Sequence, residues 1–132
     1  MNQKYYIGVP SMDEQHLRIY ELARRAQETN LSDMEMQVLI VELLEYAKFH
    51  LEDEERFLES SGLHDFLKGH LGLHTQFRVR AMDMYQQFRE AETEEARRSV
   101  LNGAAEFCEN WLLHHIDAED RKYAALLKDR KP

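Results

Sequence analysis

Apolar side chains recur along the sequence in alternating steps of four and three residues, the spacing that keeps one stripe on one face of a helix. This pattern predicts helices over residues 11–29, 32–60, 64–90 and 93–128. The connections between them are short, which favours antiparallel neighbours. We therefore expect an all-α protein, an antiparallel up-down-up-down four-helix bundle, with residues 1–10 as an N-terminal arm outside it. Leu126 is expected on the buried side of the fourth helix.

Capping residues predict where the helices begin. Ser11 with Glu14, and Ser32 with Glu35, each form the S-x-x-E pattern of a capping box. In a capping box, the serine side chain and the glutamate side chain each bind a backbone N–H at the helix start. Thr93 is the predicted N-cap of the fourth helix.

Composition limits the kinds of protein that fit. With 132 residues, 43% of them hydrophobic, the chain suits a single domain over 1–132 with one core. A formal charge of −8 argues against nucleic acid or an anionic membrane as a partner. Cys108 is the only cysteine, and no apolar run approaches about 20 residues. The first ten residues lack the charged and apolar regions of a signal peptide, so we expect none. We expect a soluble, cytoplasmic protein, and a monomer by default.

Ionisable side chains interrupt all four apolar stripes. Those residues are His16 in the first helix, His50 and Glu54 in the second, His70 and His74 in the third, and His115 in the fourth. Burying one polar group without a partner costs about 1–3 kcal/mol. A single inward histidine is more often a hydrogen-bonded core residue than a ligand, but a metal cluster would offset all these costs together.

The predicted topology brings these groups to one end of the bundle, because neighbouring helices run in opposite directions. Asp120 follows His115 at the same end. Five residues of a regular α-helix turn about 140° past alignment, so these two side chains cannot share one ideal stripe. Either they approach the cluster from two sides of a regular helix, which we favour, or a π-type turn brings them together.

Four motifs resemble those of the hemerythrin-like domains, specifically the bacteriohemerythrins. They are D-E-Q-H at 13–16, H-L-E-D-E-E at 50–55, H-L-G-L-H at 70–74 and W-L-L-H-H-I-D-A-E-D at 111–120. The motifs span nearly the whole chain in the family's order. The family's H-x-x-x-x-D pattern selects His115 and not His114 as the ligand.

The resemblance implies a non-haem di-iron centre with a bridging oxo or hydroxo group. One iron would take His70, His74 and His115, the other would take His16 and His50, and Glu54 and Asp120 would bridge the two. The apolar pocket beside the irons would consist of Ile19, Leu51, Trp111, Leu112 and Ile116. Relatives commonly carry an aromatic residue at the position of Leu51, and many carry a tryptophan where the arm here has Tyr5 and Tyr6. These departures bear on oxygen affinity and autoxidation, and not on the ligands.

With three histidines, two carboxylates and the bridging oxygen, the three-histidine metal would have six ligands. The two-histidine metal would have five and keep one position open. An open position beside a redox-active metal can bind dioxygen, another diatomic molecule or a small anion. Imidazole and carboxylate also suit zinc, manganese or cobalt, so the identity of the metal follows from the resemblance. We expect reversible dioxygen binding for transport, storage or delivery, and not an enzyme.

Three alternatives remain at this point. A gas sensor, or an enzyme that reacts with nitric oxide or peroxide, could use the same di-iron site. His64-Asp65 is similar to the metal-binding dipeptide of HD-type phosphohydrolases, which would be an unrelated enzyme. Nothing basic lines a phosphate pocket in that case, and the helix dipole explains Asp65 near a helix start.

Overall fold

The computed structural model describes residues 3–129, which form helices and short connections without any strand. The elements are η1 (Gln3–Tyr5), α1 (Pro10–Ala26), α2 (Asp33–Ser60), α3 (His64–Glu90), α4 (Glu94–His115), the π-helical turn η2 (Ile116–Asp120) and α5 (Arg121–Asp129). Positions 1, 2 and 130–132 of the predicted arm and tail lie outside this range.

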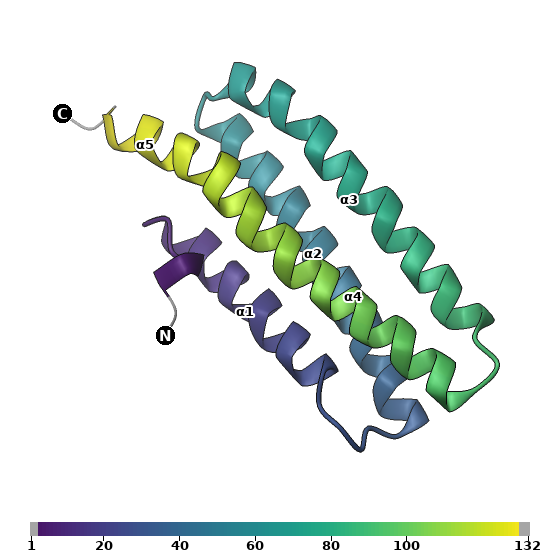
Figure 1. Ribbon diagram of the computed structural model, residues 1–132. Coiled ribbons are helices and arrows are strands. Elements are labelled where there is room, and N and C mark those ends of the chain that lie inside the picture. Colours follow the sequence, from purple (N-terminus) through teal and green to yellow (C-terminus); the bar gives the residue numbers. More distant parts are fainter. Residues whose placement is uncertain (1–2, 130–132) are drawn as a thin grey trace.

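The helices form an antiparallel bundle in which α4, η2 and α5 follow one another along a single rod (Figure 1). Helix α1 packs against α2 and α4, and α3 packs against the same two helices. Both ends of the described chain and the α2–α3 connection lie at one end of the bundle, whereas the α1–α2 and α3–α4 connections lie at the other (Figure 1). The predicted all-α four-helix bundle is confirmed.

The helix starts follow the predicted capping chemistry in two of three cases. At Ser32 both hydrogen bonds of the capping box with Glu35 are formed, and the Thr93 side chain accepts a hydrogen bond from the backbone N–H of Ala96. The prediction at Ser11 is wrong, because α1 begins one residue earlier, at Pro10. Proline suits the first helical turn, where its missing N–H has no partner in any case. The first helix also ends at Ala26, three residues before the predicted limit.

The core runs along the whole bundle and continues past the polar cluster. The larger part is formed by aliphatic and aromatic side chains of α1–α4, and a smaller cluster of Met12, Leu58, Leu63 and Tyr123 closes the end where the chain termini lie. Within residues 3–129, no helix is both long and apolar enough to cross a bilayer.

The π-helical turn corrects two predictions made for the fourth helix. Its hydrogen bonds run from residue i to residue i+5, so it holds one more residue per turn than the neighbouring α-helix. The regular helix favoured from the sequence is therefore wrong between His115 and Asp120. The extra residue also rotates every later side chain relative to the apolar stripe. Leu126, expected to be buried, is 44% exposed for this reason, and Tyr123 is fully buried instead.

Candidate metal centre

The residues singled out from the four stripes come together in one buried cluster. Their side chains come from α1 (His16), α2 (His50 and Glu54), α3 (His70 and His74), the last residue of α4 (His115) and the last residue of η2 (Asp120). None of the seven is more than 3% exposed. Their candidate ligand atoms form two groups that share Glu54, and within each group all the atoms lie within 4.8 Å of one another.

The first group, which we call the three-histidine group, consists of His70, His74, His115 and one oxygen of Glu54. The Nε2 atom of His115 lies 2.8 Å from that of His70 and 3.2 Å from that of His74. Glu54 Oε1 lies 2.8, 3.0 and 3.5 Å from the Nε2 atoms of His70, His74 and His115, respectively. Three imidazole nitrogens and a carboxylate oxygen therefore face one small volume.

The second group, which we call the two-histidine group, consists of His16, His50, Asp120 and the other oxygen of Glu54. His16 Nε2 lies 3.2 Å from Asp120 Oδ2. His50 Nε2 lies 3.8 Å from Glu54 Oε2. This group has one histidine fewer than its neighbour.

Each carboxylate divides its two oxygens between the groups. Glu54 directs Oε1 at the three-histidine group and Oε2 at His50. Asp120 directs Oδ2 at His16, while its Oδ1 lies 3.2 Å from His115 Nε2 and 3.6 Å from His70 Nε2. Two carboxylates placed in this way have the arrangement of bridges between two metal ions.

The spacing of these atoms fits octahedral coordination. Ligand atoms about 2.1 Å from a metal and at right angles to one another lie about 3.0 Å apart, close to the 2.8–3.5 Å separations in the three-histidine group. Several of the atoms also lack a hydrogen-bond partner despite complete burial. They are the Nε2 atoms of His16 and His50 and both oxygens of Asp120. Unpartnered buried lone pairs are costly without a cation to bind them, so the donor set fits metal ions.

Burial favours the neutral form of three of the imidazoles, which is the form that binds metal. It lowers the pKa of His50 to about 3 and that of His115 to about 4. It also lowers the pKa of His16, against the opposing effects of the Tyr5 carbonyl and nearby carboxylates. The lone pairs are therefore available at neutral pH.

The two carboxylates shift in opposite directions. Burial by itself raises the pKa of Glu54, but the close contacts of its carboxylate with His115, His70 and His74 outweigh that effect, so this pKa lies well below its usual range. Burial and then the neighbouring charge of Glu54 raise the pKa of Asp120 well above its usual range. Two neighbouring carboxylate anions in a dry interior repel one another, and a cation between Glu54 and Asp120 would remove that penalty.

Oxygen atoms outside the cluster orient three of the imidazoles. His16 donates from Nδ1 to the Tyr5 carbonyl at 3.0 Å, His50 to Gln15 Oε1 at 2.6 Å and His74 to Glu55 Oε2 at 2.8 Å. A proton on Nδ1 leaves the lone pair on Nε2, the atom that faces the cluster in each case. Such partners commonly fix the tautomer and rotation of metal-binding histidines.

A further set of residues forms hydrogen bonds with two of these partners and with one of the two carboxylates. Gln15 donates to Asp53 at 2.6 Å, Arg78 donates to Glu55 at 2.8 Å and the buried hydroxyl of Tyr123 donates to Glu54 Oε2 at 3.0 Å. The sequence predictions assigned no role to any of them. Gln15 and Glu55 stand directly beside ligand candidates in their motifs, and this adjacency was the available signal.

An apolar cavity adjoins the two-histidine group. It has a volume of about 10 Å³, close to the smallest space that holds one water molecule, and His50 forms part of its wall. The remaining lining consists of Ile19, Ala47, Leu51, Phe77, Cys108, Trp111 and Leu112. Four of the five predicted pocket residues are in this set. The fifth, Ile116, is fully buried at the start of the π-helical turn but does not line the cavity.

The other two histidines lie away from the cluster. His114 is exposed, and the exposed side chain of His64 pairs with Glu59 at 3.3 Å. Within residues 3–129, neither potential metal-binding group contains His64 or Asp65. The HD-type alternative therefore has no site in the described part of the chain.

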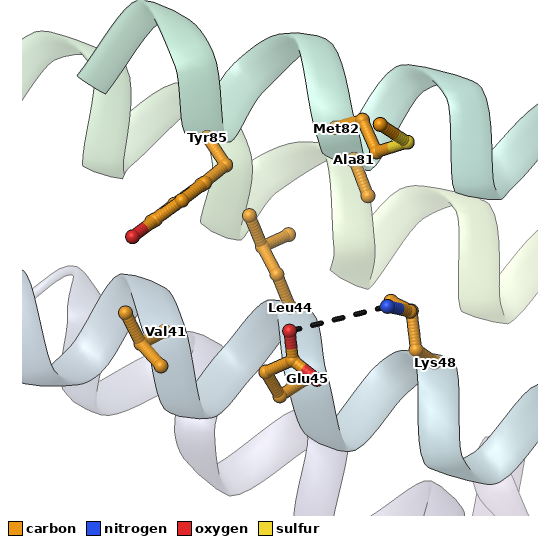
Figure 2. Close-up of a pocket in the computed structure, with 7 residues that line it drawn as sticks. All are labelled: Val41, Leu44, Glu45, Lys48, Ala81, Met82 and Tyr85. Atoms are coloured by element: carbon orange, nitrogen blue, oxygen red, sulfur yellow. Dashed lines mark ion pairs between the residues drawn. The ribbon is translucent and has the colours of Figure 1, made fainter. Parts of the chain in front are cut away.

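A larger surface groove lies between α2 and α3, away from the imidazoles. It has a volume of about 150 Å³ and is lined by Val41, Leu44, Glu45, Lys48, Ala81, Met82 and Tyr85. Figure 2 shows Leu44 between the two helices and the Lys48–Glu45 ion pair beside it. The groove offers no cluster of imidazoles or thiols, so the buried cluster is the better metal site.

Comparison with known proteins points to the same chemistry. The chain is similar to bacteriohemerythrins from Clostridium acetobutylicum (26% identity, covering 91% of this chain and 94% of the relative), Stenotrophomonas maltophilia (27%; 92% and 76%) and Methylococcus capsulatus (26%; 87% and 85%). No solved structure matches. The sequence profile described as Hemerythrin HHE cation binding domain matches residues 8–127, nearly the whole chain and all seven residues of the cluster. The four-helix bundle with its buried histidines and carboxylates is thus that of a family member, and the chain belongs to the hemerythrin HHE cation binding domain family.

Proposed function

We propose that this protein holds two iron ions in the buried cluster and binds dioxygen reversibly at the two-histidine position. His70, His74 and His115 would hold one ion, His16 and His50 would hold the other, and Glu54 and Asp120 would bridge them. A bridging oxo or hydroxo group would complete the shared ligands. Family membership and the similarity to bacteriohemerythrins support this choice of metal and ligand.

The observation that carries the proposal is the division of both carboxylates between two sets of imidazoles. A mononuclear site would gather the imidazoles around one point and would not need the oxygens of Glu54 and Asp120 to face two groups. If two metals share the carboxylates, each of the four oxygens of Glu54 and Asp120 would bind one metal. The count gives six ligands to the three-histidine position and five to the two-histidine position, with one place left for a small molecule.

The chain's own residues would favour reversible binding at that place. When bound, two ferrous ions supply the two electrons that dioxygen binding at such a centre requires. His50 belongs both to the two-histidine group and to the wall of the apolar cavity, so the cavity lies where the small molecule would enter. Side chains such as Leu51 and Leu112, each 1% exposed, would exclude water and the protons it carries. Exclusion of water and protons by these side chains would favour release of the bound molecule unchanged, with both electrons remaining at the metal centre.

The ligand types also separate this site from ferritin-like oxidases and oxygenases, which use Glu-x-x-His pairs. The residues three before each histidine are Asp13, Ala47, Ser61, Leu67, Leu71, Trp111 and Leu112. None is a glutamate. A cluster with five imidazoles and two carboxylates carries fewer negative charges, which favours high-valent iron less. This supports binding over oxidation of a substrate.

Anaerobic loading with ferrous iron tests the proposal. We expect two irons per chain, and a visible absorption band that appears with oxygen and disappears under argon over repeated cycles. His50→Ala and His74→Ala should each lose bound iron, whereas His114→Ala, at the exposed neighbour of His115, is the matched control and should retain both ions. One zinc per chain, or none, would contradict the di-iron assignment. A band that decays with consumption of oxygen would instead indicate an enzyme.

A further inference from the structure

The N-terminal segment lies beside the first part of α1, at the end of the bundle where α1 begins (Figure 1). We call residues 4–8 the strap. Tyr5 is only 2% exposed and packs against Tyr20 with ring centroids 4.9 Å apart. The strap is therefore part of the packed structure, although it precedes the first helix of the bundle.

Three consecutive carbonyl groups of the strap each accept a hydrogen bond from a residue of the bundle. Arg121 donates from Nη2 to the Lys4 carbonyl at 3.0 Å and from Nη1 to the Tyr6 carbonyl at 2.8 Å. Between them, the Tyr5 carbonyl accepts from His16 Nδ1 at 3.0 Å. The two donors of one guanidinium group thus bracket the carbonyl that orients a metal-ligand candidate.

The other end of the strap is fixed to α1 by a carboxylate. Asp13 accepts hydrogen bonds from the backbone N–H groups of Ile7 at 2.7 Å and Gly8 at 3.2 Å. Gly8 has a positive φ of 88°, a conformation that glycine adopts without the strain that a Cβ would cause. This turn lets two successive N–H groups point at Asp13, which lies one helical turn before His16.

Arg121 connects the strap to the second bridging carboxylate. It follows Asp120 directly in the chain, and its Nε donates to Asp117 in the π-helical turn at 3.0 Å. His16 and Asp120 face one another across the two-histidine group, with Nε2 and Oδ2 3.2 Å apart. One arginine therefore joins the backbone that orients His16 to the turn that presents Asp120.

We infer that the strap and Arg121 position the ligands of the two-histidine metal. Arg121 is a positioning residue, since it touches neither the cavity nor a ligand side chain. The inference rests on the proposed function and assigns a separate support to one half of the centre. The three-histidine group is oriented elsewhere, by Glu55 on α2, which accepts from His74 and is itself held by Arg78. Loss of Arg121 should therefore affect the two-histidine position, which contains both His16 and Asp120, more than the three-histidine position, which it reaches only through the shared Asp120.

The test uses the full chain, loaded with two ferrous ions, and measures the release of each ion to a chelator under anaerobic conditions. The substitutions are Arg121→Ala, Arg121→Lys and the control Arg98→Ala. Arg98 also donates to a backbone carbonyl of another segment, that of Leu31 at 3.1 Å, but at the opposite end of the bundle. Amide hydrogen exchange of residues 4–8 gives a second readout that does not depend on oxygen binding.

In Arg121→Ala we expect one of the two ions to be released about tenfold faster, the size typical for loss of a residue that supports a metal ligand. The other ion, which depends on this support only through Asp120, should be accelerated much less, and the strap amides should exchange faster. Arg121→Lys keeps the charge and one donor nitrogen, so its release and exchange rates should lie between those of Arg121→Ala and wild type. Arg98→Ala should match wild type. Equal acceleration of both ions, as global loosening would give, or no change in either ion, overturns the inference. If the wild-type protein binds two ions but the variants give either of these results, only the inference fails and the proposed function stands. If the wild-type protein binds no ions, both fail.

Discussion

The hydroxyl of Tyr123 allows a sharp test of whether Glu54 serves as a metal ligand. It donates a buried hydrogen bond to Glu54 Oε2 at 3.0 Å, and Tyr123→Phe removes this bond while keeping the ring. A hydrogen bond to a charged group contributes about 1.5–3 kcal/mol. Without metal we therefore expect the variant to lose that much unfolding free energy, a fall in Tm of roughly 5–15 °C for a chain of this length.

With metal bound, the loss should be smaller. Coordination then satisfies the charge of Glu54, and the hydroxyl contributes only as a neutral donor, about 0.5–1.5 kcal/mol. The variant should thus bind metal more tightly than wild type by about 1 kcal/mol, roughly fivefold. Urea unfolding with and without metal measures both values, and Tyr85→Phe at the α2–α3 groove serves as the control. An equal loss of stability in both states would refute a metal-ligand role for Glu54.

Three further predictions concern other parts of the molecule. Burial raises the pKa of Cys108 to about 12, so a thiol reagent at pH 8 should label it only in denaturant; rapid labelling of native protein would contradict this. Leu51→Phe should fill the cavity beside His50 and weaken small-anion binding to the ferric form by roughly 5- to 150-fold in a spectral titration, equivalent to the about 1–3 kcal/mol of overpacking. Ser32→Ala should cost about 1 kcal/mol in urea unfolding and leave metal content unchanged, because this cap lies at the opposite end of the bundle.

The bundle could be predicted because its information is local and periodic. Apolar spacing gave α2 and α3 almost to the residue, and the capping box at Ser32 formed as expected. The same reasoning failed at Ser11, where α1 already begins at Pro10 and Asp13 in its first turn binds the strap. That contact depends on how the arm folds back, which spacing along one helix does not encode.

The cluster could be predicted in part because its residues lie on the periodic apolar stripes. The stripes and the family motifs placed His16, His50 and Glu54 at one end of the bundle, and the structure brings them together. Their assignment as iron ligands stays a prediction, as do a monomeric state and a cytoplasmic location. The surrounding partners were missed because pairs such as Gln15 with His50 and Tyr123 with Glu54 depend on the rotation of one helix against another.

The π-helical turn has a consequence for how this sequence can change. The α3–α4 connection around residues 91–93 could gain a residue at the surface with little effect on the interior. Removal of one residue from the segment 116–120 would restore a regular helix but swing Asp120 away from His16 by about 100°, the rotation of a single α-helical step. The chain length between His115 and Asp120 is therefore set by the geometry of the buried cluster, although a helix of either length would fold.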